Sequence, residues 1–480
     1  MSPGLSAIPI RLVRRGAVCL FGALMTSMAA ASESGRGLAE LQSFGAVAAR
    51  ALEQHPEIGQ RRAVLEAQVR AVEAARSGWR PRLDLAGQSG RERVNAFTGG
   101  AAVELGGVSR RATLVARQVL YDGGEISGEA ERQARIGNQR YFELRDAEDQ
   151  LLQDLARAWI DVQRHRALIG IARRSLDDLE GLAALVRSRV EAGLSRGVDL
   201  EQALARVASA QLALAVDEAN LREAQVRFER TALTSAPRTL PSLDPDERLL
   251  PADLRRMVSL AVAYAPGLRA AAESVAVVDA ELRIRRSAFH PKTALELRHD
   301  LEARSAVLPN AASSSLLVTV NLNLFSGGGD QLRARDTATR LDAARLAQQD
   351  RSAAVEQTVR VAWSDWQRQL ATAESAGRYA DAVERARALY QVQYEIGQRS
   401  LLDLLNAENE LAQSRRLRAG AAHDLMTARV RLLGLSGALV PAAGVGRTPA
   451  DPIVAPADGQ EVDLPVPEAL PHLKAAHARL

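Results

Sequence analysis

The chain has 480 residues, a formal net charge of +4 and one cysteine, Cys19. Hydrophobic residues make up 47% of it but aromatic residues only 4%, so the apolar content is mainly Ala, Leu and Val, which suits long, closely packed helices better than a thick globular core. A single cysteine excludes an internal disulfide framework, and no cluster of Lys and Arg with interleaved aromatic residues predicts nucleic-acid binding.

Residues 1–31 predict a secretory signal peptide. Positions 11–15 hold three arginines, positions 16–30 are apolar but too few to span a bilayer, and positions 29–31 are alanines that fit the small-residue cleavage pattern. We expect cleavage after residue 31, which removes Cys19 and leaves an exported mature chain. These flanks disfavour the alternative, a cytosolic N-terminal helix. No later run of 18 or more apolar residues predicts a spanning helix.

The rest of the chain is an internal duplication with an offset of 204 residues over most of its length. The equivalent pairs include Leu120 and Leu324, Trp159 and Trp363, Gly193 and Gly397, and Asp199 and Asp403. We therefore predict two repeats, 32–232 and 252–436. A Pro-rich linker, 233–251, joins them, and a Pro- and Ala-rich tail, 437–480, follows and is expected to be extended.

Each repeat is predicted to hold the same elements in the same order: a helix, two strands, a Gly-Gly turn, a very long helix and a shorter helix. In the first repeat the predicted elements are 38–78, strands at about 82–94 and 112–122, and helices 126–191 and 200–232. In the second repeat they are 252–288, strands at about 293–303 and 315–326, and helices 330–395 and 402–434.

The first long helix carries a coiled-coil pattern. From Leu151 to Val190 eleven of twelve seam positions, spaced alternately by four and three residues, are apolar. The exception, His165, is interpreted as a tolerated polar seam residue, because no second metal ligand stands at a suitable spacing. Two shorter helices stacked end to end match one long helix, which is roughly 100 Å long. We expect the helices before and after the linker to stack, and the N-terminal helix to stack with the C-terminal one.

Apolar and polar residues alternate in the predicted strands over about ten residues, the length of a membrane strand. The pattern is clearest in the run Leu316, Val318, Val320, Leu322 and Leu324. Loops 95–111 and 304–314 are expected to face outside. Surface hairpins on a soluble protein are the alternative. Four strands cannot enclose a barrel, since the smallest membrane barrels have about eight, so several copies are expected to combine.

With the duplication and the helix tips in view, the chain resembles TolC-like outer-membrane factors over roughly residues 38–436. The most specific matches are the tips at 394–406 and 192–200. The resemblance implies a mostly α fold with a small β part. It implies a duplicated chain that forms, as a trimer, a 12-stranded outer-membrane β-barrel continued by a 12-stave periplasmic α-helical barrel of coiled coils. The implied location is the outer membrane of a Gram-negative bacterium, extending into the periplasm.

The resemblance also implies a periplasmic gate. Asp403 would form a ring of three carboxylates at the tapered entrance, and Asn406 stands where the family prototype has a second acidic ring. Arg399 and Tyr394 match positions that tether one coiled coil to its neighbour, and Asp199 matches an acceptor. The tip residues implied to contact the adaptor are Gly193, Leu194 and Gly397.

The sequence predicts a passive channel and not an enzyme, because it has no phosphate-binding loop, zinc-ligand spacing or nucleophile elbow. No cofactor and no metal site are expected. The resemblance extends to the outer-membrane component of a type I secretion system that exports an RTX-type adenylate cyclase–haemolysin toxin. The implied partners are a homotrimer, a periplasmic adaptor, an inner-membrane ABC transporter, the exported protein and outer-membrane lipid. The alternatives are the outer-membrane component of a tripartite multidrug efflux pump and a non-porous periplasmic coiled-coil protein.

Overall fold

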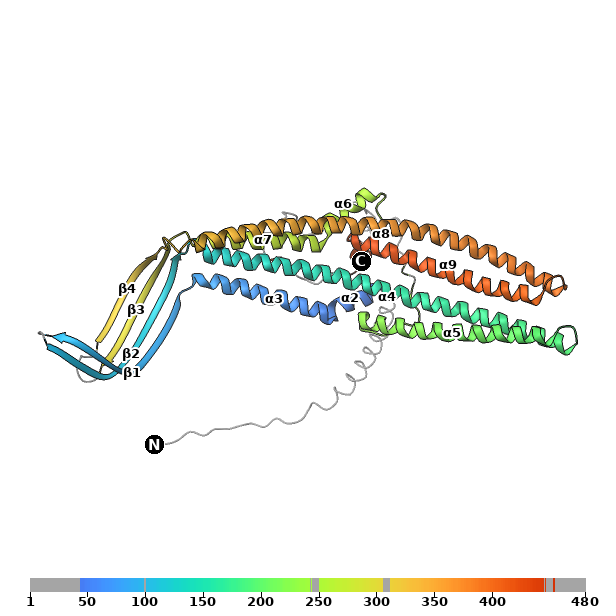
Figure 1. The fold of residues 1–480 in the computed structure, drawn as a ribbon, viewed down its shortest axis with the longest axis horizontal. Helices are drawn as coiled ribbons and strands as arrows, with labels where there is room; N and C mark the ends of the chain where they lie inside the picture. The colour runs from blue at the N-terminus through green and yellow to red at the C-terminus, as the bar shows by residue number, and fades with distance from the viewer. Residues whose placement is uncertain are drawn as a thin grey trace, which may run out of the picture.

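The computed structural model describes residues 44–98, 101–241, 243, 250–304, 311–443, 445 and 452–453. Within these ranges the chain is an elongated bundle of helices with a sheet at one end (Figure 1). The mostly α fold with a small β part is therefore confirmed. The predicted signal peptide and most of the tail lie outside the described residues.

The sheet consists of β1 (Arg82–Thr98), β2 (Ala101–Tyr121), β3 (Lys292–Arg304) and β4 (Ala311–Asn321), antiparallel and in that spatial order. The two repeats join where β2 pairs with β3. Because the order ends with β1 on one side and β4 on the other, the sheet has two edges that no described strand covers.

The strand limits differ from the prediction in both repeats, and β4 begins at Ala311, inside the predicted loop 304–314. β1 and β2 pair as far as Thr98 and Ala101, so strand extends into the predicted loop 95–111. Pairing with β2 sustains the end of β1, where the sequence has little apolar alternation. In the second repeat, β4 ends at Asn321 and not at 326, because Asn321 already pairs with Lys292, the first residue of β3.

Two 67-residue helices, α4 (Glu125–Glu191) and α8 (Gly329–Glu395), run the length of the helical part. Each starts after a glycine in the left-handed conformation, Gly124 at φ 89° and Gly328 at φ 82°, which a side chain would disfavour. At the first turn Asp122 accepts hydrogen bonds from the backbone N–H groups of Gly124, at 2.9 Å, and Ile126, at 2.5 Å. These contacts satisfy free N–H groups where α4 begins.

The helices predicted at 38–78 and 252–288 are each broken in two. The structure has α2 (Phe44–Gln54) and α3 (Pro56–Arg76), which leads into a short 3-10 turn (Ser77–Trp79), and then α6 (Leu254–Tyr264) and α7 (Pro266–Ser287). Pro56 and Pro266 occupy the first turn of the second helix in each pair. A proline there lacks the N–H that would continue the preceding helix, so the prediction of one continuous helix was wrong.

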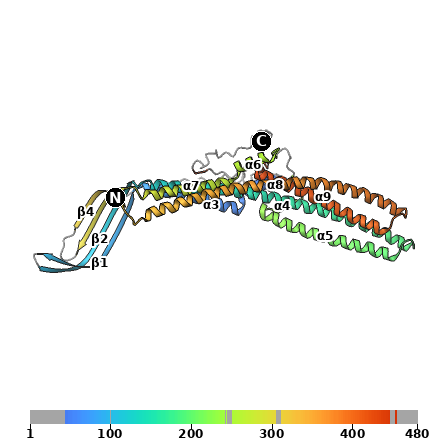
Figure 2. The ribbon, with the colours of Figure 1, turned by 45° about the horizontal axis from the view of Figure 1, so that its top comes forward.

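The shorter helices stack differently from the prediction (Figures 1 and 2). The two remaining helices are α5 (Gly197–Ala232) and α9 (Leu401–Leu435). Across the layer, α3 and α5 lie next to α4, α4 lies next to α7 and α9, and α7 and α9 lie next to α8. Helices of the same repeat therefore stack, α2 and α3 with α5, and α7 with α9, while the short α6 packs against the middle of α8. A short turn ties α5 to α4, and the β1–β2 hairpin ties α3 to the same helix.

The linker consequently crosses α4 at mid-height instead of joining two stacked helices. The indole N–H of Trp159 donates to the Pro241 carbonyl at 3.1 Å, and the Arg166 side chain donates to the Pro237 carbonyl at 2.6 Å. The Trp159 ring is fully buried and packs edge-on against Phe44, with ring centroids 5.5 Å apart. The main apolar core therefore surrounds the middle of α4, and α2, α5, α6, α8 and the end of α9 contribute to it.

Candidate functional site

The candidate site lies at the end of the helical layer opposite the sheet, where two tips reverse the chain. In the second tip the N–H of Gly397 donates to the Tyr394 carbonyl at 3.1 Å, and the φ of Gly397 is 79°. Ser400 caps α9 by accepting a hydrogen bond from the Asp403 N–H at 3.2 Å. The capped turn fixes Asp403 in the first turn of α9, where a carboxylate is favourable.

Arg399 is held within its own tip. Its Nε donates to Gln393 Oε1 at 3.0 Å, its guanidinium lies 4.3 Å from the centre of the Tyr390 ring, and Nη1 is 3.8 Å from Asp403 Oδ2. The Arg399 and Asp403 side chains are 38% and 43% exposed, so solvent screens this ion pair strongly. Both groups remain accessible to a partner outside the chain.

Tyr394 does something different from Arg399: it is buried and joins the two tips. The Arg189 guanidinium of α4 lies 4.8 Å from the centre of the Tyr394 ring. The apolar cluster around this ring comprises Leu179, Leu182, Val186, Leu401, Leu404 and Leu405. Because residues of α4, α8 and α9 form this cluster, it holds the tip ends of the α4–α5 and α8–α9 hairpins together.

The first tip has the same backbone shape. Gly193 has φ 70°, and the N–H of Leu194 donates to the Arg189 carbonyl at 2.8 Å. Leu194 is 79% exposed at the end of the molecule, so it is free to meet a partner. Asp199 caps α5, since its carboxylate accepts from the Arg196 N–H at 3.1 Å. Within the described chain Asp199 and Arg399 thus contact different groups and not one another.

A second predicted residue, Asn406, also links the two hairpins. Arg206 of α5 donates to the side-chain oxygen of Asn406 on α9, at 3.5 Å. Asn406 therefore stands at a junction of the α4–α5 and α8–α9 hairpins. The structure brings together Tyr394 with α4, Arg399 with Asp403, and Asn406 with α5. Asp199 contacts only the start of its own helix, α5, among these predicted residues.

A stronger link was missed by the sequence analysis. Arg416 of α9 donates from both terminal nitrogens to Asp217 of α5, at 2.6 and 2.8 Å, and the Asp217 side chain is only 2% exposed. This two-pronged hydrogen bond raises the pKa of Arg416. Higher up, Arg164 of α4 donates to Asp424 of α9 at 2.8 Å. These pairs join the hairpins above the tips.

Residues that match across the duplication guided the prediction of the tips. The Arg416–Asp217 pair has no such match. The residue 204 positions after Asp217 is Ala421, and the residue 204 positions before Arg416 is Leu212. No repeat signal could therefore have found the pair. An acid and an arginine on the facing sides of two predicted helices were the only signal.

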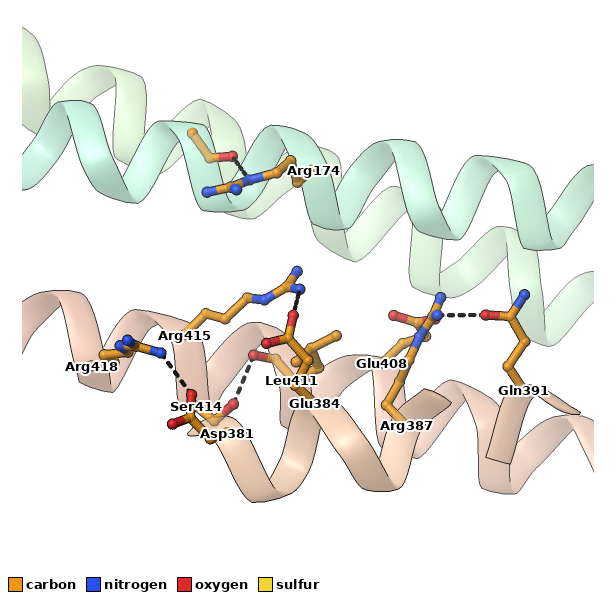
Figure 3. A network of polar contacts seen from close by, with 11 residues as sticks. Arg174, Asp381, Glu384, Arg387, Gln391, Glu408, Leu411, Ser414, Arg415 and Arg418 are labelled. Carbon is orange, nitrogen blue, oxygen red and sulfur yellow. Dashed lines mark hydrogen bonds and ion pairs between the residues drawn. The ribbon is translucent and has the colours of Figure 1, made fainter. Parts of the chain in front are cut away.

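Within the α8–α9 hairpin a ladder of charged pairs replaces part of an apolar seam (Figure 3). Asp381 pairs with Arg418 at 2.9 Å, Glu384 accepts from Arg415, and Arg387 Nε donates to the buried Glu408 at 2.6 Å. The hydrogen bond from Arg415 holds the pKa of Glu384 below its usual value. The equivalent α4–α5 hairpin has Arg173–Glu218 as its cross-helix ion pair, at 3.1 Å.

Among residues 44–98 and the other described ranges, no group of three potential metal ligands occurs. His165 is partly buried on α4, and burial lowers the pKa of its imidazole. None of the helices that the structure describes is long and apolar enough to cross a membrane.

The chain was compared with known proteins. The family model described as "Outer membrane efflux protein" matches residues 47–232 and 257–438. The outer membrane efflux protein BepC of Brucella suis biovar 1 is 25% identical over 432 residues, which cover 88% of this chain and 89% of BepC.

Solved channels share the fold. The CusC structure has a TM-score of 0.72 at 17% identity and covers 84% of this chain and 92% of CusC. The VceC structure from Vibrio cholerae has a TM-score of 0.69 at 17% identity and covers 84% of this chain and 97% of VceC. At this level of identity the likeness shows the fold.

Proposed function

Because the chain belongs to the outer membrane efflux protein family, we propose that it is a passive exit duct of the outer membrane, formed by several copies of the chain. In this proposal the sheet lies in the membrane and the helices extend into the periplasm. The chain moves no substrate by its own chemistry, so a partner in the inner membrane supplies the energy.

One observation carries this proposal: the sheet and the helical layer of a single chain are both open and do not close around a lumen. The sheet has two uncovered edges, β1 and β4, and the helical layer likewise ends in α3 and α5 on one side and α8 on the other. Unpaired strand edges in a membrane are unfavourable, and pairing between copies removes them. Three copies would give twelve strands and twelve staves, enough to leave a lumen.

The nature of the cargo is the finer part of the proposal. The matched family and BepC both carry efflux in their names, which favours the outer-membrane component of a tripartite efflux pump working with an adaptor. Type I secretion of an RTX-type toxin, implied by the sequence resemblance, is the second candidate. Its support is the overall likeness of the sequence and no single motif, and relatives near 25% identity fix the family but not the cargo.

The tips are proposed to act as the gate of the duct. The separate partners of Asp199 and Arg399 within one chain leave both side chains available to a neighbouring copy. An arginine–carboxylate bond between copies would be charge-assisted and directional, so breaking a few such links would bias the tips towards an open state. Gly193, Leu194 and Gly397 would then meet the adaptor. The exposed Asp403 carboxylates would line the entrance.

Deletion of the gene tests the cargo directly. An efflux role predicts increased sensitivity to several unrelated drugs, with protein secretion unchanged. A secretion role predicts retention of one large protein inside the cell, with drug sensitivity unchanged. Reconstitution in planar bilayers tests the duct itself. Discrete conductance steps are expected, and a protein that inserts without any conductance would point to the non-porous alternative.

A further inference from the structure

The long helix α4 has a notch at Gly137, in the half of the helix nearer the sheet. Ile453, from the C-terminal part of the same chain, fills this notch. A β-carbon added at Gly137 would stand 2.1 Å from Cδ1 of Ile453 and 3.1 Å from its Cγ1. The same position would lie 3.5 Å from Cγ of Gln68 on α3. The missing side chain at Gly137 therefore makes the space that Ile453 fills, beside the groove between α3 and α4.

A hydrogen bond holds the main chain at the same place. The N–H of Ile453 donates to the side-chain oxygen of Asn138 at 2.8 Å. Asn138 is fully buried, and its amide nitrogen in turn donates to Glu273 of α7 at 3.2 Å. Glu273, only 1% exposed, also accepts from Arg135 at 3.5 Å. Ile453 thus completes a buried polar chain that runs from α4 to α7.

The described residues that precede this C-terminal segment in the chain, up to Val445, pack against the helices. After α9, a β-carbon at Gly437 would collide with the Tyr264 ring of α6, and Tyr264 donates to Asp149 of α4 at 2.5 Å. Val445 is 7% exposed and belongs to the main core. From Asp149 to Asn138 α4 rises by about 16 Å towards the sheet, a distance that the seven residues between Val445 and Ile453 are long enough to span.

We propose that residues 452–453 form a C-terminal clasp, which binds the α3–α4 groove of its own chain and fastens the end of the second repeat to the first. Main-chain hydrogen bonding to Asn138 gives the clasp its register, and the fit of Ile453 at Gly137 gives it selectivity for a branched apolar side chain. This role is independent of the cargo of the duct and of the gate.

A pair of glycine substitutions tests the notch. Gly170 lies on the same helix, and a β-carbon there would meet nothing within 4 Å, so Gly170→Leu is the matched control for Gly137→Leu. In the full chain, Gly137→Leu is expected to lower the midpoint of thermal unfolding by about 4 °C relative to Gly170→Leu. In a chain that ends at Val445 the two variants are expected to melt together. A deficit of Gly137→Leu that persists without the tail would overturn the proposal.

A cross-link tests which copy supplies the clasp. In a Cys19→Ser background, cysteines at Gly137 and Ile453 are within disulfide reach, because Cγ1 of Ile453 is 3.1 Å from the β-carbon position. Oxidation is expected to give a link within one chain, seen by mass spectrometry of the digested protein and as monomer mobility on a non-reducing gel. Links between chains would place a neighbour's tail in the notch, and no link at all would leave it empty. Either result contradicts the proposal.

Discussion

The helices α4 and α8 are equivalent parts of two repeats and have the same length, yet they are packed very differently. α4 buries 26 of its residues, whereas α8 buries eight. α4 has helices on both sides along its length, α3 and α5 on one and α7 and α9 on the other, while α8 has α7 and α9 on one side and only the short α6 against its middle on the other. Position in the layer, and not the shared ancestry of the repeats, therefore decides how much of each helix is buried.

The exposed side of α8 is apolar at intervals along its length. The large apolar residues exposed there are Leu332, Leu346, Val361, Leu370, Tyr379, Leu389 and Val392, whereas α4 exposes Leu185. A helix that presents such a face needs a partner. The difference between α4 and α8 therefore supports the proposal that a neighbouring copy covers α8 in the assembled duct.

The equivalent tryptophans Trp159 and Trp363 include the residue whose substitution is expected to have the largest effect on stability, Trp159. Trp159 is fully buried between Phe44 and Phe228, so Trp159→Ala is expected to cost about 4 kcal/mol of unfolding free energy. Trp363, packed edge-on against Trp366 with ring centroids 4.9 Å apart, lies on the less buried helix, and Trp363→Ala is expected to cost about 2–3 kcal/mol. Urea unfolding in detergent measures both. Equal losses would contradict the contrast.

The tie between the hairpins comes next in size. Arg416→Ala leaves the buried Asp217 carboxylate without its partner, so a loss of about 3 kcal/mol is expected. Arg173→Ala is the control, since the Arg173 and Glu218 side chains are 63% and 40% exposed, and it is expected to cost less than about 1 kcal/mol. The same urea titration compares them. A small loss in Arg416→Ala would show that α9 does not depend on α5.

These residues also show how far the sequence could lead. The long helices and the Gly-Gly turns followed from a period of three and four and from glycines that need positive φ. The breaks at Pro56 and Pro266 were visible as prolines but were placed inside longer helices. The pairing of Asp217 with Arg416 could not be predicted from the duplication, because neither residue has a charged equivalent in the other repeat.

Helix stacking could not be predicted from lengths. Both possible pairings of the shorter helices give staves of the same length, so the match of two shorter helices to one long helix cannot choose between them. The choice depends on side chains that the linker meets as it crosses α4, such as Trp159 and Arg166. At the tips, the resemblance pointed to Tyr394 and Arg399 but not to their contacts within the chain, Arg189, Tyr390 and Gln393, because these depend on how the helices and the turn are placed in space.

The apolar face of α8 supplies the third prediction. Leu389 is 63% exposed, so Leu389→Asp should leave the fold of one chain intact. If a neighbouring copy covers it, each copy loses about 2 kcal/mol of apolar burial, and the assembly is expected to fall apart. Light scattering after size-exclusion chromatography in detergent gives the number of chains. Leu185→Asp on α4 is the control and should assemble normally. Intact assemblies of Leu389→Asp would remove α8 from the interface.

The tips are expected to differ in a smaller way. Asp199→Ala and Arg399→Ala should each increase single-channel conductance, because each removes one proposed link of about 1–3 kcal/mol between copies. Arg196→Ala is the control at the first tip, since Arg196 is 87% exposed and contacts Asp199 of its own tip. Unchanged conductance in both variants would contradict the tether. Asp403→Ala should weaken block by multivalent cations if the carboxylates form a ring.

The smallest effect is expected from the charged ladder that the α8–α9 hairpin uses. The hydrogen bond from Arg415 lowers the pKa of Glu384 in the folded chain, so the folded state binds fewer protons than the unfolded state near the usual pKa of about 4.3. The stabilisation is therefore present above that pH and is lost as pH falls through the lowered pKa. Because the Glu384 side chain is 56% exposed, it amounts to less than about 1 kcal/mol.

Hydrogen exchange can detect an effect of this size because it reports on each helix separately. Between pH 7 and pH 3, the α8–α9 hairpin should lose protection faster than the α4–α5 hairpin, whose seam is more apolar. Glu384→Gln should remove part of that difference, whereas Glu374→Gln, which breaks an exposed pair within α8, should not. If both hairpins lost protection in parallel, the charged pairs would not contribute to the stability of the α8–α9 hairpin. The contrast between α4 and α8 would then depend on apolar burial alone.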